Sequence, residues 1–242
     1  MQNINRYHKE VSILLERILS KQKSKFKKIA NEFFDTYKKD GMIYIFGTGH
    51  SHMLAEEGHF RAGGFAPICP ILNSSLMLHE DTTFSSVLER TEGVATKLIN
   101  KYNITENDIL VIFTNSGVNQ APLEAAYLAK KIKCKTVGVS SEKYSKIAKK
   151  SKYKKKLFEV VNYHIDNCGP PGDALININK KFNVSPFSTI AGSFILNSIL
   201  SEVAELCKNE KPFPFYISGN MPNAQKHNDQ LAKHYKKRNP HI

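Results

Sequence analysis

The sequence predicts an α/β protein built in three layers, with a mostly parallel five-stranded sheet between layers of helices. Short runs of β-forming apolar residues, such as MIYIFG (42–47) and DILVIFT (108–114), alternate along the 242 residues with segments of helical periodicity. The connections are short, as in the right-handed strand–helix–strand units that build a parallel sheet. No linker or change of composition interrupts this pattern, so we expect a single domain.

The chain divides into a helical arm (1–40), an α/β core (41–207) and a C-terminal tail (208–242) that ends in a short basic helix. Apolar residues of the arm recur at helical spacing over 5–39, in one or two helices that stop at Asp40-Gly41. Strands of the core are expected at 42–47, 66–72, 108–114, 135–141 and 157–165, with a further short strand at ALINI (174–178). Helices are expected at 51–61, 84–101, 122–133 and 187–207, with a lysine-rich helix after residue 141.

The composition favours a small anionic ligand over nucleic acid. The formal net charge is +13, but the excess is almost entirely lysine, and the chain has only five arginines. Arginine is the residue that most often reads base edges and forks onto phosphates. We interpret the densest basic run, KKSKYKKK (149–156), as the solvated end of a helix, and we expect no nucleic-acid partner.

Cysteine and apolar patterns indicate a cytoplasmic protein without a membrane partner. The four cysteines are scattered and include no CxxC pair, which is typical of reduced thiols in the cytosol. No apolar run approaches the roughly 18 residues that span a bilayer. The first ten residues, MQNINRYHKE, lack the apolar centre of a signal peptide.

The stretch IFGTGHSH (45–52) is the first candidate binding loop. It follows a predicted buried strand, and in a parallel sheet ligands bind beyond the carboxyl ends of the strands. Its glycines expose backbone N–H groups, and the following helix N-terminus favours an anion. The dinucleotide pattern GxGxxG fails because His52 stands at the third glycine position, and the chain contains no P-loop. We therefore expect no nucleotide cofactor.

The stretch TNSGVNQAP (114–122) is the second candidate loop. It follows the clearest predicted strand and offers short polar side chains around Gly117, which permits a tight turn into the next helix. Two strand ends that carry hydroxyl groups and glycines, but no arginine, suit a single phosphate monoester. We call residues 47–52 the first glycine loop and residues 114–119 the second glycine loop.

Together these motifs resemble those of the SIS (sugar isomerase) domain family. GTGHS is similar to that family's first glycine-serine loop, and TNSGVN resembles its Ser-x-Ser-Gly-x-Thr phosphate loop, with Thr114 and Asn119 as departures. VSPFST (184–189) resembles a third polar stretch at the start of a long helix. The tail FYISGNMPNAQKHN (215–228) is similar to the endings of small stand-alone SIS proteins of phosphoheptose-isomerase type.

This resemblance implies an SIS or flavodoxin-like fold and a phosphorylated sugar as the ligand. It also implies a homo-oligomer, a dimer or a tetramer, in which a neighbour supplies cleft residues. The residues expected at the sugar phosphate are Gly49, Ser51, Thr114, Ser116, Gly117, Asn119, Ser188 and Thr189. Helix capping is the structural alternative for Ser51 and Ser188.

The resemblance further implies aldose-ketose isomerisation by a glutamate base. AEEGHFR (55–61) resembles a phosphoheptose-isomerase segment whose second glutamate acts in catalysis, which points to Glu57, with Glu56 as a rival. A surface ion pair with Arg61 is the alternative role of Glu57. Those isomerases carry a histidine in their last long helix, and this chain has none at 187–207. His52 is the first candidate to replace it, ahead of His50, His164 and His227.

Several alternatives stay open on the sequence. His52, Glu56 and His59 share a helical face that could hold zinc, as some phosphoheptose isomerases use a metal, but we expect no metal site. Glu89 and Arg90 are interpreted as surface charges. The protein could instead be a non-catalytic phosphosugar sensor, or an SIS lyase or etherase acting on an amino-sugar phosphate. The identity of the sugar is not encoded in any motif.

Overall fold

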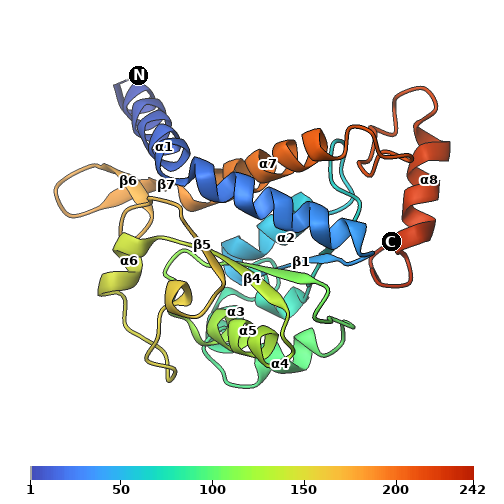
Figure 1. Ribbon diagram of the computed structural model, residues 1–242. Coiled ribbons are helices and arrows are strands. Elements are labelled where there is room, and N and C mark those ends of the chain that lie inside the picture. The colour runs from blue at the N-terminus through green and yellow to red at the C-terminus, as the bar shows by residue number, and fades with distance from the viewer. Residues whose placement is uncertain (1) are drawn as a thin grey trace.

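The computed structural model describes residues 2–242 and confirms the predicted α/β architecture (Figure 1). Five parallel strands form one sheet in the order β2-β1-β3-β4-β5. Their bounds are β1 (Ile43–Gly47), β2 (Ile68–Pro70), β3 (Ile109–Phe113), β4 (Lys135–Ser140) and β5 (Tyr163–Asp166). The chain runs from β1 to β2 on one side and then places β3 on the other side of β1, so the strand order reverses between β1 and β3.

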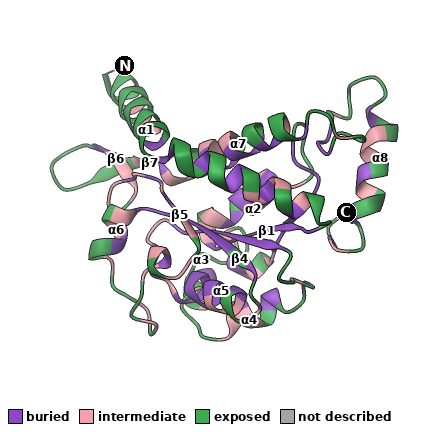
Figure 2. Cartoon of the chain, viewed as in Figure 1, coloured by how far each residue is buried: buried purple, intermediate pink, exposed green. Residues whose placement is uncertain are grey.

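Successive side chains of the strands point to opposite faces of the sheet and belong to two separate hydrophobic clusters. Ile43 and Ile45 of β1 face the cluster under α1 (Gln2–Lys38), α2 (Met53–Gly58) and α7 (Ser188–Leu206). Tyr44 and Phe46 face the cluster under α4 (Val94–Ile99) and α5 (Gln120–Lys131). Both faces of the sheet are therefore covered, and β1, β3 and β4 at its centre are almost entirely buried (Figure 2).

The predicted arm is one helix, α1, which lies along α7 over the sheet (Figure 1). Its buried residues recur every three or four positions: Leu14, Ile18, Gln22, Phe26, Ile29, Ala30, Phe33 and Thr36. This spacing places them on one stripe, which is the pattern of a helix that packs on a core. The first turns extend past the sheet, where the Tyr7 hydroxyl donates to the Pro186 carbonyl at 2.8 Å.

Four expected elements differ from the structure. The helix predicted at 51–61 is reduced to α2, which begins after a 3-10 helix and ends at Gly58. The helix predicted at 84–101 is two, α3 (Thr82–Leu88) and α4, because Gly93 adopts φ +84° between them. The strand predicted at 157–165 keeps only β5, since Leu157–Glu159 form a 3-10 helix (η3) that buries Leu157 against Gly138. The lysine-rich helix, α6 (Glu142–Ile147), ends before most of the lysines.

A hairpin that the sequence did not fully predict projects beside the start of α7. β6 (Ala174–Asn177) matches the expected short strand, and β7 (Asn183–Pro186) pairs with it antiparallel. Most β7 residues are exposed, so the strand lacks the apolar alternation that would reveal it in sequence. Two further 3-10 helices, η1 (Gly49–His52) and η2 (Ser74–Leu76), follow β1 and β2.

The tail ends in the predicted helix, α8 (Ala224–Tyr235), and returns to the sheet. Phe215 forms an isolated bridge with Phe65, and the Arg238 guanidinium donates to the buried Asp108 carboxylate at 2.6 Å. Asp108 also accepts from the Met42 N–H at 2.8 Å, so one carboxylate joins the tail to the starts of β1 and β3. Across residues 2–242, no helix combines the length and apolar character needed to cross a bilayer.

Candidate functional site

The two glycine loops meet at the point where the strand order reverses. The first glycine loop (47–52) follows β1, and the second (114–119) follows β3, which is its hydrogen-bonded neighbour. Connections that leave in opposite directions open a crevice at the carboxyl ends of these strands, and this is where open α/β sheets bind ligands. The sequence predicts both loops at neighbouring strand ends, and the pairing of β1 with β3 places them there.

Close backbone contact shapes the first glycine loop. A Cβ atom at Gly47 would lie 2.3 Å from the Ser51 carbonyl oxygen, so the turn requires glycine at this position. Gly49 then adopts φ +56°, a region that favours glycine, and the chain enters η1. Ser51 lies inside η1, its N–H donates to the Thr48 carbonyl at 3.1 Å, and it does not cap α2.

His52 is fully buried and uses both ring nitrogens inside the protein. Nδ1 lies 3.2 Å from Glu56 Oε1, and Nε2 accepts from the Asn73 N–H at 3.2 Å. Because the Asn73 N–H is a donor, Nε2 must be the unprotonated nitrogen. The proton of the neutral ring is therefore on Nδ1 and points to Glu56. Burial lowers the pKa of His52, which keeps the ring neutral. In this arrangement His52 fastens the first glycine loop to the segment after β2 and has no nitrogen free for a ligand.

The second glycine loop is supported by Ser145 of α6 and by Asn167, which directly follows β5. Gly117 adopts φ +65°, and a Cβ atom there would lie 2.7 Å from Ser145 Oγ. Ser145 Oγ donates to the Ser116 carbonyl at 2.7 Å, and Asn167 Nδ2 donates to Asn115 Oδ1 at 3.0 Å. The loop is therefore held rigidly, with its carbonyl side satisfied by the protein.

Its donor side is unsatisfied. Ser116 Oγ is inaccessible to solvent and has no hydrogen-bond partner among the described residues. Within residues 2–242, the backbone N–H groups of residues 116–119 also have no protein acceptor. They precede the N-terminus of the 12-residue helix α5, which carries partial positive charge. A row of free donors at a helix start is suited to a phosphoryl group.

Glu89 joins the two loops. Its carboxylate accepts from Thr48 Oγ1 at 2.8 Å and from Asn119 Nδ2 at 3.0 Å, and its side chain is only 17% exposed. The interpretation of Glu89 as a surface charge is therefore wrong. Sequence spacing could not reveal the link, because Glu89 lies about 40 residues from Thr48 and 30 from Asn119.

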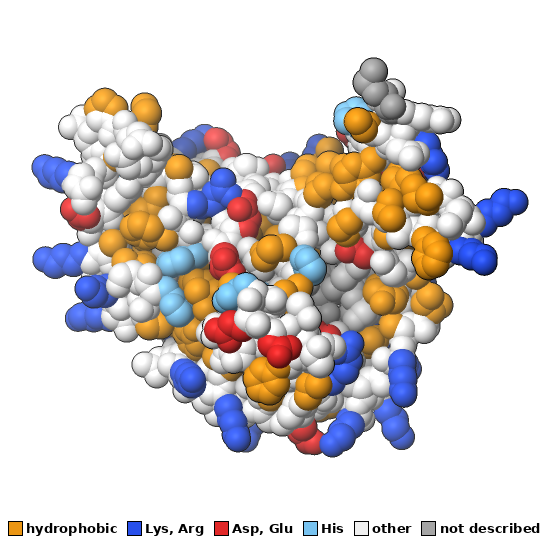
Figure 3. Space-filling view, turned by 180° about the vertical axis from the view of Figure 1, so that it is seen from behind, with side chains coloured by type: hydrophobic (Ala, Val, Ile, Leu, Met, Phe, Trp, Pro, Cys, Tyr) orange, Lys and Arg blue, Asp and Glu red, His pale blue; other side chains and the backbone are white. Residues whose placement is uncertain are grey.

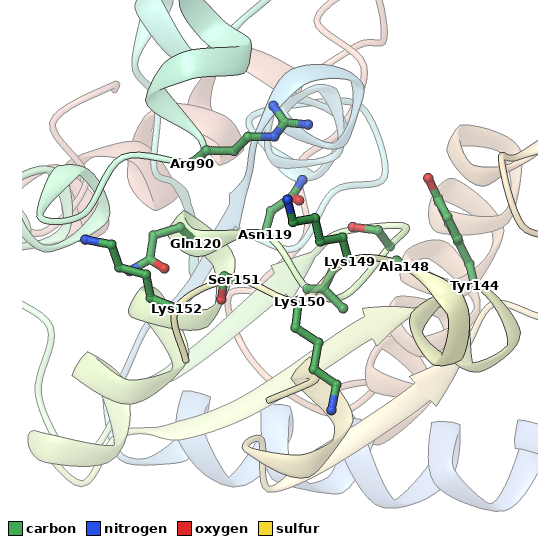
Figure 4. Close-up of a pocket in the computed structure, with 11 residues that line it drawn as sticks. Arg90, Asn119, Gln120, Tyr144, Ala148, Lys149, Lys150, Ser151 and Lys152 are labelled. Atoms are coloured by element: carbon green, nitrogen blue, oxygen red, sulfur yellow. The ribbon is translucent and has the colours of Figure 1, made fainter. Parts of the chain in front are cut away.

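Two cavities flank the loops. The Ser116 cavity, of about 470 Å³, is lined by Ser116, Asn119 and Gln120 and by residues 148–152 of the segment after α6 (Figure 4). This volume falls within the roughly 300–1,000 Å³ typical of small-molecule sites. The His52 cavity, of about 450 Å³, is lined by Gly49, His52 and Glu56 and by residues 77–79. Ser51 and Thr114 line neither cavity.

A sequence model of the SIS domain matches residues 6–141 of this chain. The chain belongs to the SIS domain family. A UPF0309 protein of Brucella canis is 37% identical over 239 residues, 98% of each chain. A UPF0309 protein of Brucella anthropi is 40% identical over 204 residues, 84% of each chain.

Solved structures share the fold of this SIS protein. A phosphoheptose isomerase from Francisella tularensis gives a TM-score of 0.56 at 13% identity and covers 84% of this chain and 97% of its own. The sugar isomerase domain of an RpiR transcription factor from Sphaerobacter thermophilus gives 0.53 at 10% identity, with 98% and 99% covered. Both identities are low enough that the likeness concerns the fold alone.

Glu57 of this SIS protein lies against α7, away from both cavities. Its Oε1 contacts Arg61, as the alternative reading of this residue expected, and accepts from Ser193 Oγ and Asn197 Nδ2 at 3.2 Å each. Ser193 and Asn197 are thus the α7 side chains that contact Glu57. Glu56 is turned toward His52 instead.

An acidic residue accepts hydrogen bonds from the first residue of α7 and from the residue before it. Asp173 accepts from the N–H and the hydroxyl of Ser188, at 2.7 Å each, and from the Phe187 N–H at 3.2 Å. The carboxylate already satisfies the donors that an anion would need. Neither Ser188 nor Thr189 lines the Ser116 cavity, so this third polar stretch is separate from the other two.

The three side chains considered for zinc do not converge. His52 and Glu56 are in contact, but His59 Nε2 donates to the His241 carbonyl at 3.4 Å, on the side of the C-terminal tail. In the described part of the chain, no group of three or more His, Cys, Asp or Glu side chains has the geometry to hold a metal ion. The spacing predicts one helical face, but α2 spans only Met53–Gly58, so His52 and His59 lie outside it at its two ends.

Proposed function

We propose that this SIS protein binds a phosphorylated sugar in the Ser116 cavity, with its phosphoryl group at the second glycine loop. The observation that carries this proposal is the buried Ser116 hydroxyl, which has no partner and sits beside free backbone N–H groups. A buried hydroxyl without a hydrogen bond costs about 1–3 kcal/mol, and a phosphoryl oxygen would remove that cost. Thr114, Gly117 and Asn119 belong to the same loop, and Gly49 and Ser51 would support it from the end of the neighbouring strand β1.

We further propose aldose-ketose isomerisation in a homo-oligomer, with Glu57 as the base that moves the proton between C1 and C2. Within one chain Glu57 does not line the Ser116 cavity, so a second copy would have to complete the cleft. An exposed apolar area supports such an assembly: Ile4 and Ile13 on α1 and Phe182 and Val184 on the hairpin are all more than 40% exposed. Figure 3 shows apolar side chains gathered near the N-terminal end of the molecule.

A non-catalytic phosphosugar sensor is the second candidate function. It is favoured by the pairing of Glu57 with Arg61, Ser193 and Asn197, which leaves no histidine beside the proposed base. An SIS-type lyase or etherase acting on an amino-sugar phosphate is a third candidate, since it would use the same carboxylate. Four free thiols support a cytoplasmic location for any of these activities.

Isothermal titration with glucose 6-phosphate, fructose 6-phosphate, ribose 5-phosphate and sedoheptulose 7-phosphate tests binding. We expect at least one to bind, and Ser116→Ala to weaken it about tenfold, which corresponds to about 1.4 kcal/mol. Ser201→Ala, a change of an exposed serine on α7, is the matched control. Absence of binding across the panel would overturn the proposal.

Proton exchange in heavy water separates the enzyme from the sensor. An isomerase incorporates solvent deuterium at C2 of the bound aldose phosphate, and Glu57→Gln abolishes the incorporation while binding persists. Binding without exchange would support the sensor. Release of a C3 substituent from an amino-sugar phosphate would identify the lyase.

A further inference from the structure

The lysine-rich segment after α6 forms a wall of the Ser116 cavity. α6 ends at Ile147, and residues 148–152 then run beside the second glycine loop, where the Ser151 N–H donates to the Val118 carbonyl at 3.3 Å. As predicted, Lys149, Lys150 and Lys152 are exposed at the end of a helix, but residues 148–152 also line the cavity, which the sequence did not indicate. Residues of this segment line the same cavity as Ser116 and Asn119.

The four cations around this space are not equivalent. Arg90 Nη1 lies 3.0 Å from Glu89 Oε1, and Lys152 Nζ lies 3.0 Å from Glu92 Oε2, so both charges are neutralised. Lys149 and Lys150 form no ion pair with any residue of the described chain, 2–242. In Figure 4 the Lys149 side chain extends toward Asn119 and Arg90, whereas Lys150 extends in the opposite direction. Lys149 is thus the unpaired cation on the ligand side.

Buried polar atoms without partners come from both walls. Gln120, only 3% exposed, leaves Oε1 without a hydrogen bond at the start of α5. Ser151 Oγ is likewise inaccessible and unpaired, as is Ser116 Oγ across the contact between the two segments. Three residues that line one cavity thus each leave a buried polar atom without a protein partner, and a ligand that donates and accepts hydrogen bonds would satisfy such atoms.

We propose that Lys149 and Ser151 are ligand-binding residues that complete the anion site. They bind the same phosphoryl group as the second glycine loop, Lys149 by charge and Ser151 by its hydroxyl, and Gln120 accepts from a sugar hydroxyl. The ligand class is a sugar phosphate monoester in its dianionic form. This inference rests on the proposed function, because it concerns the same cavity, but it adds a segment outside residues 6–141, which the SIS model matches.

Titration of the full-length protein with inorganic phosphate and with fructose 6-phosphate tests the inference. We expect Lys149→Ala to weaken binding of both ligands about tenfold and Ser151→Ala to weaken it severalfold, as the loss of charge-assisted and neutral hydrogen bonds predicts. Lys149→Arg should restore most of the affinity. Raising the salt concentration should weaken the wild type more than Lys149→Ala, since screening acts on the charge that the variant lacks.

Lys150→Ala and Lys152→Ala are the matched controls, and each should stay within about twofold of the wild type. If Ser116→Ala loses affinity while Lys149→Ala and Ser151→Ala do not, the inference is overturned and the proposed function stands. Equal losses of affinity in all three lysine→Ala variants would also overturn it, because they would indicate attraction by the overall positive charge rather than one specific contact. If the wild type binds neither ligand, the proposed function falls as well. Circular dichroism of each variant checks that the fold is intact.

Discussion

The Thr48 hydroxyl donates a hydrogen bond to the Glu89 carboxylate at 2.8 Å. This bond joins the loop after β1 to the end of α3, where Glu89 also contacts the loop after β3. Thr48 is 7% exposed, and Asn119 donates to the other oxygen of the same carboxylate. The geometry of the candidate site thus depends on one acid that contacts both loops. Its position between them also keeps Arg90 neutralised at the mouth of the Ser116 cavity.

Glu89→Ala should lower the free energy of unfolding by about 1–3 kcal/mol, because two largely buried donors lose their acceptor. Urea denaturation measures the change. Glu92→Ala, which removes a carboxylate with 65% exposure, is the control and should stay within about 0.5 kcal/mol. Equal effects of the two substitutions would show that Glu89 does not hold the loops together.

Gly117→Ala should destabilise the protein by about 1–2 kcal/mol and abolish phosphate binding. The backbone there has φ +65°, which costs roughly 1–2 kcal/mol for a residue with a Cβ atom, and that atom would lie 2.7 Å from Ser145 Oγ. Gly219→Ala is the matched control, because its Cβ atom would meet nothing within 4 Å. Thermal unfolding and phosphate titration check both variants. Wild-type behaviour of Gly117→Ala would mean that the second glycine loop tolerates another shape.

His164 should make stability depend on pH. The ring, on β5, is largely buried, with Nε2 2.9 Å from Ser140 Oγ of β4, and burial, together with the Lys25 charge, lowers its pKa from 6.5 to about 4. The unfolded chain therefore binds a proton between about pH 6.5 and 4 that the folded chain rejects, so this contribution to stability is lost as the pH falls through that window. We expect the loss to reach roughly 3 kcal/mol.

His164→Gln should flatten that part of the pH profile in urea denaturation measured from pH 7 to pH 4. His234→Gln, a change of a ring with 56% exposure, is the control and should leave the slope unchanged. A wild-type slope in His164→Gln would assign the pH dependence to other groups.

Arg238→Ala should be among the most destabilising single changes in the tail, at about 3–5 kcal/mol. It leaves the Asp108 carboxylate, which is fully buried, without its cation. Lys237→Ala removes the exposed neighbouring charge and should be nearly neutral. Denaturant unfolding measures both. A small effect of Arg238→Ala would indicate that Met42 and Thr105 satisfy the acid by their own hydrogen bonds.

Sequence patterns were sufficient to predict the strands of the sheet, because a strand that is buried on both faces is a continuous apolar run. ILVIF in β3 and IYIFG in β1 are buried at every position, and such runs bounded by glycine and polar residues predict strands directly. The failures occurred where tertiary contacts override local preference. VVNYHI continues an apolar pattern, but Leu157 turns under Gly138 and shortens β5, and the exposed β7 gave no apolar signal.

In the candidate site, too, local patterns predicted some residues and tertiary contacts decided the others. Ser116 and Gly117 were selected from composition and turn chemistry, and the structure places Ser116 on a cavity with an unpaired hydroxyl. His52 was selected for its position after a loop, but its two hydrogen bonds commit the ring to the protein. Lys149 was set aside as one of many lysines, because a one-dimensional run cannot show which of its members lack a partner.

By itself the sequence determined the parallel sheet, the two glycine loops at its strand ends and the membership in the SIS family, because apolar periodicity and glycine placement are local properties of the chain. Only the tertiary structure decided that Glu89 joins the loops, that Lys149 faces the Ser116 cavity and that Glu57 lies against α7. Those are relations between segments from 30 to 140 residues apart, and they depend on how helices pack on the sheet and on which charges are left unpaired after packing.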